Sequence, residues 1–368
     1  MTRPVFVLAL TVALSGVAHP FDSAQGRPFG FAQGRQQQPV FRGGTRTVPV
    51  FVTVNDGDGG FALNLTQDDF EIKDNGKVQT ITQFTTATQA LSALLLLDGS
   101  SSMWSVFDTL LEGANSFILR MLPEDRTAIA SFADRFQMRQ PFTSDRDALL
   151  GHLRDQFNVR VGLETHLWDA LDESMHAFTK EPNRRVIVLL SDGKNWVNPP
   201  QSQMPRPGQP VRPGQPPPPG SRGKPGLPPP LPPSSPGPGS MPGSSTPSYS
   251  SGARGTAIIS NAIGRDIMVY TIAMWTMTDE KLPDRPNAAM TRISDQTGGG
   301  FFELRLSDDI GATFTQIMAE LHHQYLLGFT PAALDGKEHR LDVRVKKSGM
   351  RARARRSYIA SVDGEISR

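Results

Sequence analysis

Two aspartates and three hydroxyl side chains stand where buried strands of this sequence are predicted to end. Asp98, Ser100 and Ser102 directly follow the apolar run "ALSALLLL". Asp192 follows a second run, "RVIVLLS", and Thr165 lies just before a predicted helix in "GLETHLWDAL". In open α/β sheets, ligands bind beyond the carboxyl ends of the strands, where the loops converge. We therefore expect three loops to bring these five side chains to one point.

The chemistry of this set points to a hard metal ion. All of its ligand atoms are oxygens, which suit Mg²⁺, Mn²⁺ or Ca²⁺ and not zinc. The set carries only two formal negative charges, and such a low ligand charge leaves a divalent ion under-neutralised. The vacant position of the ion should therefore attract a carboxylate from outside. The set therefore predicts capture of a partner protein that supplies an acidic side chain, with Mg²⁺ as the first choice of ion.

Enzymatic alternatives fit these residues less well. A nucleophile elbow needs G-x-S-x-G, but no glycine completes that pattern after Gly99 and Ser101. The phosphate-binding pattern G-x-x-x-x-G-K-[ST] does not occur in the sequence. An aspartyl phosphotransferase would need a second acid two residues after Asp98, where Ser100 stands. The remaining enzymatic hypothesis is a divalent ion acting as a Lewis acid, but no general base is positioned nearby, so we expect no enzyme.

Strands and helices alternate from residue 90 onward. The apolar runs are nearly continuous, which is typical of strands buried on both faces. Their alternation with helical patterns predicts an α/β fold with a doubly wound, mostly parallel sheet and helices on both faces. The segment "RFQMRQPF" has no crossover helix before it and predicts an antiparallel edge strand. The expected helices lie near 104–121, 145–156, 166–178, 254–264, 285–297 and 308–325.

These residues resemble the von Willebrand factor type A (VWA) domain family over about residues 90–328. "DGSSSM" matches the metal-ion-dependent adhesion motif of that family, D-x-S-x-S followed by Met. The resemblance implies a metal site with Asp98, Ser100 and Ser102 in the first loop, Thr165 in the second and Asp192 in the third. The flanking sequences "LTQDDFEIKDNGKVQ" and "QYLLGFTP" resemble a bacterial group of VWFA-related proteins.

Two residues near the site leave alternatives open. The family commonly has Gly before the threonine of the second loop, whereas this sequence has Glu164. Glu164 could add a ligand, although we favour a carboxylate that points to solvent. Trp104 follows the motif at the start of a helix, where core packing is the default and an exposed recognition surface is the alternative.

Small β segments are expected on both sides of the α/β domain. Residues 40–88 read as a β module with a tight turn at Asn75-Gly76, and residues 329–368 as a strand pair. Alternation along the second segment puts Arg351, Arg353 and Arg355 on one face. That face is read as a solvated edge protected by charge, or alternatively as a binding surface for an anionic envelope polymer. A net charge of +2 gives no drive toward nucleic acid.

The remaining segments are compositionally distinct. Residues 1–18 have the charged, apolar and small-residue regions of a signal peptide, which predicts export to the periplasm, the cell envelope or the medium. Residues 19–39 are expected to form a disordered tether. Residues 199–248 form a Pro-rich insertion, expected to be disordered and to shield or extend the binding face. No second apolar stretch predicts an integral membrane protein.

Two functions from different classes fit this organisation. The first is an exported, metal-dependent adhesion or interaction module. The second is a structural envelope subunit that binds through its β segments and uses the metal only to order the loops. The absence of cysteine excludes disulfides and thiolate zinc sites from either.

Overall fold

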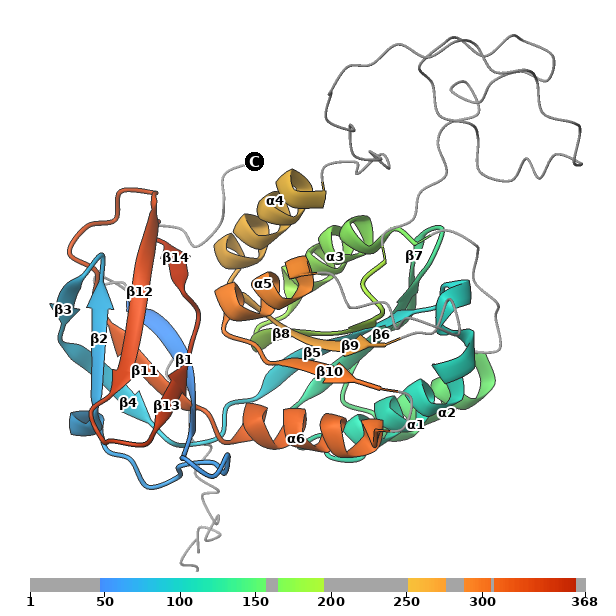
Figure 1. Cartoon of the computed structure of the whole chain (residues 1–368), viewed down its shortest axis with the longest axis horizontal. Coiled ribbons are helices and arrows are strands. Elements are labelled where there is room, and N and C mark those ends of the chain that lie inside the picture. The colour runs from blue at the N-terminus through green and yellow to red at the C-terminus, as the bar shows by residue number, and fades with distance from the viewer. Residues whose placement is uncertain (1–46, 157–164, 195–250, 276–287, 306–307, 362–368) are drawn as a thin grey trace, which may run out of the picture. The chain divides into compact units, whose positions relative to one another are not determined.

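The protein is described here by a computed structural model (Figure 1). It describes residues 47–156, 165–194, 251–275, 288–305 and 308–361. The predicted signal peptide, tether and Pro-rich insertion, and Glu164, lie outside the described residues.

A mostly parallel sheet forms the centre of the α/β domain. Its strand order is β10-β9-β8-β5-β6-β7, and all neighbours are parallel except β6 and β7. This confirms the predicted sheet and its antiparallel edge strand. The strands are β5 (Leu91–Asp98), β6 (Arg126–Phe132), β7 (Phe136–Thr143), β8 (Arg184–Ser191), β9 (Ile267–Met274) and β10 (Phe301–Leu304).

Helices cover both faces of this sheet. In Figure 1, α3, α4 and α5 lie on one face and α1, α2 and α6 on the other. The apolar side chains of β5 pack on both faces of the sheet. Leu94 and Leu96 pack on the side of α3, α4 and α5, whereas Leu95 and Leu97 pack on the side of α1, α2 and α6. The helices are α1 (Phe107–Ile118), α2 (Arg146–Gln156), α3 (Leu167–His176), α4 (Ser251–Gly264), α5 (Ala288–Thr297) and α6 (Ile310–His322), with 3₁₀ turns at Gln67–Asp69, Ser101–Val106 and Ala177–Lys180.

The described N- and C-terminal β segments build one sandwich. One sheet has the order β13-β1-β11-β4 and the other β14-β12-β2-β3. Apolar side chains from both sheets, among them Val50, Ile72 and Leu327, form its core. The strands are β1 (Val48–Asn55), β2 (Phe70–Asp74), β3 (Lys77–Gln79), β4 (Ile81–Thr85), β11 (Tyr325–Phe329), β12 (Glu338–Val345), β13 (Arg351–Arg353) and β14 (Ser357–Ile359).

This pairing differs from the division expected from the sequence. The sequence predicts residues 40–88 and 329–368 as separate segments, and β11 lies largely within the predicted α/β range of 90–328. In the structure β11 lies between β1 and β4 and pairs with both. A strand pair with one apolar face is marginal by itself, so the two segments cover each other. Such pairing across more than 200 residues leaves no local pattern in the sequence.

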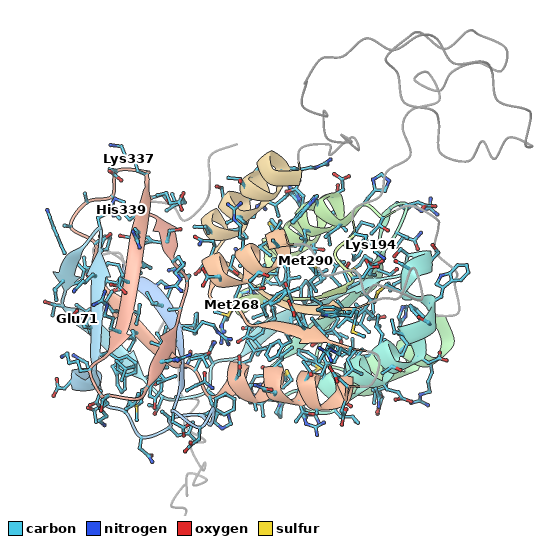
Figure 2. All side chains as sticks on the ribbon, viewed as in Figure 1. Glu71, Lys194, Met268, Met290, Lys337 and His339 are labelled. Carbon is cyan, nitrogen blue, oxygen red and sulfur yellow. The ribbon has the colours of Figure 1, made fainter. Side chains whose placement is uncertain are left out.

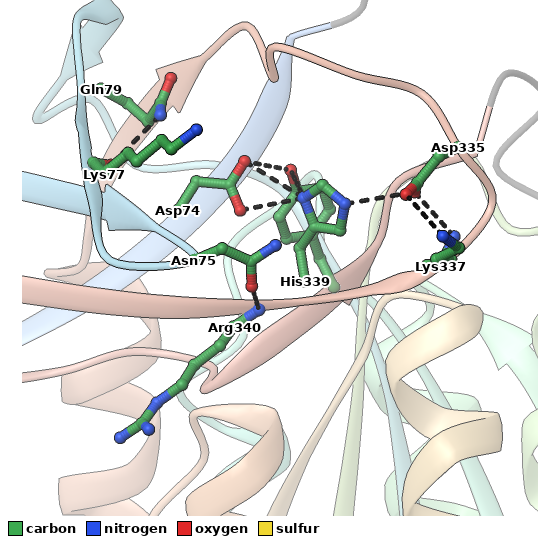
Figure 3. Close-up of polar contacts among 9 residues, drawn as sticks. Asp74, Asn75, Lys77, Gln79, Asp335, Lys337, His339 and Arg340 are labelled. Atoms are coloured by element: carbon green, nitrogen blue, oxygen red, sulfur yellow. Dashed lines mark hydrogen bonds and ion pairs between the residues drawn. The ribbon is translucent and has the colours of Figure 1, made fainter.

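A buried polar network closes one end of the sandwich (Figure 3). His339 Nδ1 lies 3.0 Å from Asp74 Oδ1, and its Nε2 lies 3.2 Å from Asp335 Oδ1. The Tyr358 hydroxyl donates to Asp74 Oδ2 over 3.1 Å. Because Asp74, His339 and Tyr358 come from β2, β12 and β14, the network links three of the four strands of this sheet.

The basic face expected at the C-terminus is mostly used inside the protein. Arg351 is exposed, as predicted. Arg353 instead pairs with the buried Glu320 of α6, and Arg355 Nη1 lies 2.5 Å from Asp266 Oδ1. The expectation of a shared solvated face is therefore wrong for Arg353 and Arg355. Alternation along a strand identifies a common face, but it does not show that another element covers that face.

Candidate functional site

Asp98 is a buried carboxylate at the carboxyl end of β5. Its Oδ1 accepts a hydrogen bond from the Ser100 amide over 2.9 Å. Its Oδ2 accepts a hydrogen bond of 2.6 Å from the Ser191 hydroxyl, at the end of the neighbouring strand β8. Asp98 thus lies at the carboxyl edge of the sheet, as the sequence predicts. The Ser191 hydroxyl at the end of β8 fixes the orientation of its carboxylate.

The two serines of the first loop lie side by side. Ser100 Oγ and Ser102 Oγ are 3.2 Å apart, with Ser100 buried and Ser102 partly exposed. Ser100 precedes the 3₁₀ turn 101–106, yet its hydroxyl makes no capping hydrogen bond to that turn. A serine before a helical turn usually uses its hydroxyl in this way. Here the hydroxyl oxygens face each other, an arrangement in which both can serve one ligand.

Asp192 follows β8 and carries the second buried carboxylate. Its Oδ1 accepts the Lys194 amide over 3.1 Å, and its Oδ2 lies 3.4 Å from Lys194 Nζ. Gly193 between them has a φ of 75°, a conformation that favours glycine. Figure 2 shows Lys194 at this end of the sheet.

Thr165 lies at the same edge of the sheet. It is buried and directly precedes His166, the N-cap residue of α3. The His166 amide donates to the Ala133 carbonyl over 3.0 Å, and the Gly99 amide donates to the Phe132 carbonyl over 2.8 Å. The first and second loops are therefore both tied to the carboxyl end of β6. Within the described residues, the structure brings four predicted side chains into direct or electrostatic contact, and it places the residue after Thr165 at the same edge of the sheet.

The electrostatics of this cluster favour a cation. Burial raises the pKa of Asp98 to about 7, and repulsion from Asp192 adds to the effect. Hydrogen bonds from Ser100 and Ser191 oppose the shift without cancelling it. A divalent ion between two such carboxylates would remove their repulsion and stabilise both in the charged form. Carboxylate and hydroxyl oxygens are also the donors that Mg²⁺, Mn²⁺ or Ca²⁺ would need, so the residues present fit such an ion.

The surface around the cluster includes an aromatic side chain. Trp104 is 49% exposed, whereas its neighbour Met103 is fully buried. Of the two alternatives for Trp104, the structure supports a surface position. Sequence reasoning missed Ser191 and Lys194, although Ser191 immediately precedes Asp192. The only sequence signal for it was a hydroxyl at the end of an apolar run.

Residues 93–194 match the family profile of the von Willebrand factor type A domain. The matched range contains all five predicted site residues. The chain contains a von Willebrand factor type A domain. The observed sheet and helix layers agree with the VWA fold predicted from the sequence.

Several solved structures resemble this chain only distantly. An aerotolerance-related membrane protein from Bacteroides fragilis is 15% identical, with 63% of this chain and 98% of that chain covered and a TM-score of 0.41. A von Willebrand factor type A protein from Catenulispora acidiphila is 12% identical, with 88% and 76% covered and a TM-score of 0.44. Proximal thread matrix protein 1 from the mussel byssus, with a zinc-occupied MIDAS motif, is 12% identical, with 66% and 48% covered and a TM-score of 0.43.

No curated protein matches the chain. Among the described helices, none combines the length and the apolar character that crossing a membrane requires.

Proposed function

We propose that the VWA domain holds a divalent cation, Mg²⁺ as the first choice, through Asp98, Ser100, Ser102, Thr165 and Asp192. The observation that carries this proposal is the buried Asp98, whose pKa is raised by burial and by the nearby Asp192. Asp192 has Lys194 Nζ nearby, whereas Asp98 accepts hydrogen bonds from an amide and a hydroxyl, so a cation beside Asp98 would offset the cost of burying its charge. The ion supplies positive charge with a free coordination position, and the hydroxyls of Ser100 and Ser102 supply neutral ligands.

The same domain is proposed to bind a partner protein through that ion. The hydroxyl ligands add no charge, so the ion keeps an affinity for a carboxylate of the partner. Trp104 offers apolar contact area beside the cluster, and aromatic side chains are enriched in protein interfaces. The function is therefore binding and not turnover. Export to the cell envelope or beyond is part of the proposal and rests on the N-terminal sequence pattern.

A specific observation also supports the structural alternative. β3 is an edge strand of the sandwich, and its Val78 is 63% exposed. An unpaired edge with an exposed apolar side chain can pair with a strand of another protein. In that case binding would occur through the β segments, and the metal would only order the loops.

Thermal unfolding in the presence and absence of metal tests the metal site. The full-length protein is unfolded in EDTA and then with excess Mg²⁺, Mn²⁺ or Ca²⁺. An ion at 100 times its dissociation constant stabilises the folded state by about 2.7 kcal/mol. We expect this shift in the wild type and not in Asp98→Ala. The control is Asp147→Ala, an exposed aspartate of α2 that should keep the full shift.

Equal midpoints with and without metal in the wild type would contradict the metal site. Partner capture then separates the two functions. Loss of binding in Asp98→Ala, with folding unchanged, supports capture through the ion. Retained binding in Asp98→Ala and lost binding in Val78→Lys would instead support the structural alternative.

A further inference from the structure

A small cavity lies at the end of the central sheet opposite the proposed metal site. It is lined by residues at the starts of β8 and β9, the end of α4 and the strand β1, together with Arg355. Figure 2 shows Met268, one of the lining residues, at the end of the sheet away from Lys194. Three of the lining side chains are arginines, Arg184, Arg185 and Arg355, and Asp266 is the one acid among the lining residues that the structure describes.

Arg184 is hydrogen-bonded only to neutral acceptors among the described residues. Its guanidinium donates to the Leu321 carbonyl over 3.3 Å, to the Gln324 side-chain oxygen and to the Met268 sulfur. It also stacks on the ring of Phe51, with 4.1 Å between Cζ and the ring centroid. Its Nε is buried without a hydrogen-bond partner. No ion pair in the described part of the chain includes Arg184, and burial lowers its pKa to about 10.

The two other arginines leave the local charge unbalanced. Arg185 donates to the Arg265 carbonyl over 3.1 Å, which is again a neutral acceptor. Arg355 pairs with Asp266 and donates to the Pro49 carbonyl over 2.6 Å, and its Nε is buried without a partner. Three guanidinium groups and one carboxylate, that of Asp266, thus line the described part of the cavity, and Asp125 lies near enough to Arg184 to act on its charge. Since these partly buried guanidinium groups outnumber the carboxylates around them, the cavity favours an anion.

The size of the cavity restricts the kind of anion. Its volume is about 20 Å³. About 10–15 Å³ on the same measure is enough for one water molecule. A space of this size suits one small anion. A water molecule would fit as well, but it would leave the excess positive charge in place.

We propose that this cavity binds a monatomic anion of the size of chloride between Arg184, Arg185 and Arg355. The anion supplies a counter-charge in direct contact with Arg184, which only neutral groups contact among the described residues, and it can accept hydrogen bonds from guanidinium groups. It also joins the two parts of the structure, because Arg355 and Phe51 belong to the β segments and Arg184 and Arg185 to the central sheet. Its expected role is to hold the sandwich against the α/β domain. This site is independent of the proposed metal site.

Anion-specific stabilisation provides the first test. The full-length protein is unfolded thermally in EDTA, in sodium chloride or in sodium gluconate at equal ionic strength. We expect chloride to raise the midpoint by about 2–4 °C in the wild type, which corresponds to a modestly populated site. Arg184→Met should lose this difference. Arg154→Met, an exposed arginine of α2, should retain it.

Crystals of the wild-type protein soaked in bromide provide a second test that does not depend on a variant. An anomalous peak among the three arginines is expected. Equal midpoints in the two salts, or a cavity without bromide, would overturn the proposal. An equal loss of the chloride effect in Arg184→Met and Arg154→Met would overturn it too, since a general salt effect would then explain the shift.

Discussion

At the scale of single residues, the proposed site depends on how Asp98 is held. A carboxylate at the end of a central strand is buried by the strands on both sides, and a second carboxylate, Asp192, lies on the loop after the neighbouring strand β8. The Ser191 hydroxyl and the Ser100 amide orient Asp98 and keep its oxygens at the edge of the sheet. The carboxylates of Asp98 and Asp192 repel each other, and a bound cation would remove this repulsion.

This repulsion predicts a pH dependence for the metal-free protein. The pKa of Asp98 is raised from 3.8 to about 7, so between these values the folded state keeps a proton that the unfolded state releases. Stability must then fall as pH rises from about 4 to 7, and it stays low above that range. Asp98→Asn removes this contribution. In urea unfolding with EDTA from pH 5 to 8, the variant should gain stability relative to the wild type as pH rises.

Saturating Mg²⁺ should reverse that order at pH 8, because the ion favours the charged carboxylate of the wild type. If the free energies of unfolding of the wild type and Asp98→Asn change in parallel from pH 5 to 8 in EDTA, Asp98 does not cause this pH dependence.

At the scale of elements, the packing of α1 on α6 positions the helix that follows the first loop of the proposed site. Gly113 in α1 allows Phe314 of α6 to approach closely, because a Cβ atom at residue 113 would lie 2.5 Å from the Phe314 ring. The rings of Phe117 and Phe314 meet edge to face with 6.1 Å between their centroids. Since α1 follows the first loop directly, the position of that loop depends on this contact.

Two glycine-to-alanine variants in neighbouring helices should therefore have opposite effects. Gly113→Ala should destabilise the protein by about 1–3 kcal/mol through overpacking against Phe314. Gly151→Ala in α2, where a Cβ meets no atom within 4 Å, should stabilise it by about 0.5–1 kcal/mol through helix propensity. Denaturant unfolding measures both. A stabilised Gly113→Ala variant would mean that α1 and α6 separate more easily than the structure shows.

At the scale of the whole described chain, the sandwich and the α/β domain are joined by buried polar contacts. Gln324 Nε2 donates to Thr53 Oγ1 over 2.6 Å and to the Tyr270 hydroxyl over 3.3 Å. Arg353 pairs with Glu320, which is 3% exposed. Because β11 follows α6 almost directly, the last helix of one part leads into a central strand of the other. Residues from both parts therefore belong to one hydrogen-bonded junction.

Removing one member of this junction should be costly. Arg353→Ala leaves Glu320 as a buried carboxylate without its partner and should lower the free energy of unfolding by about 3 kcal/mol. Arg351→Ala, two residues earlier and exposed, should change it by no more than about 0.5 kcal/mol. The two variants are compared by urea unfolding of the full-length protein. Similar values for both would show that the Arg353 charge is exposed to water in solution.

Much of the α/β domain could be predicted because its signals are local. The run Leu94–Leu97 is long enough to show burial on both faces, and helical patterns between such runs require parallel crossovers. The apolar run before Asp98 predicts a strand that ends there, and the D-x-S-x-S spacing keeps Ser100 and Ser102 in the segment that directly follows. The part of the site carried by a single loop was therefore within reach of the sequence.

Only the tertiary structure decided what lies opposite each of these segments. The hydrogen bond from Ser191 to Asp98, the pairing of β11 with β1 and the contact of Arg353 with Glu320 all join residues that are far apart in the chain. Such contacts depend on which faces are left to be covered once the sheet has formed, and hydrophobic pattern does not encode that choice. The sequence by itself determined the strands, the loops and the kind of ligand atoms, whereas the folded chain determined their partners and the charge that remains unpaired.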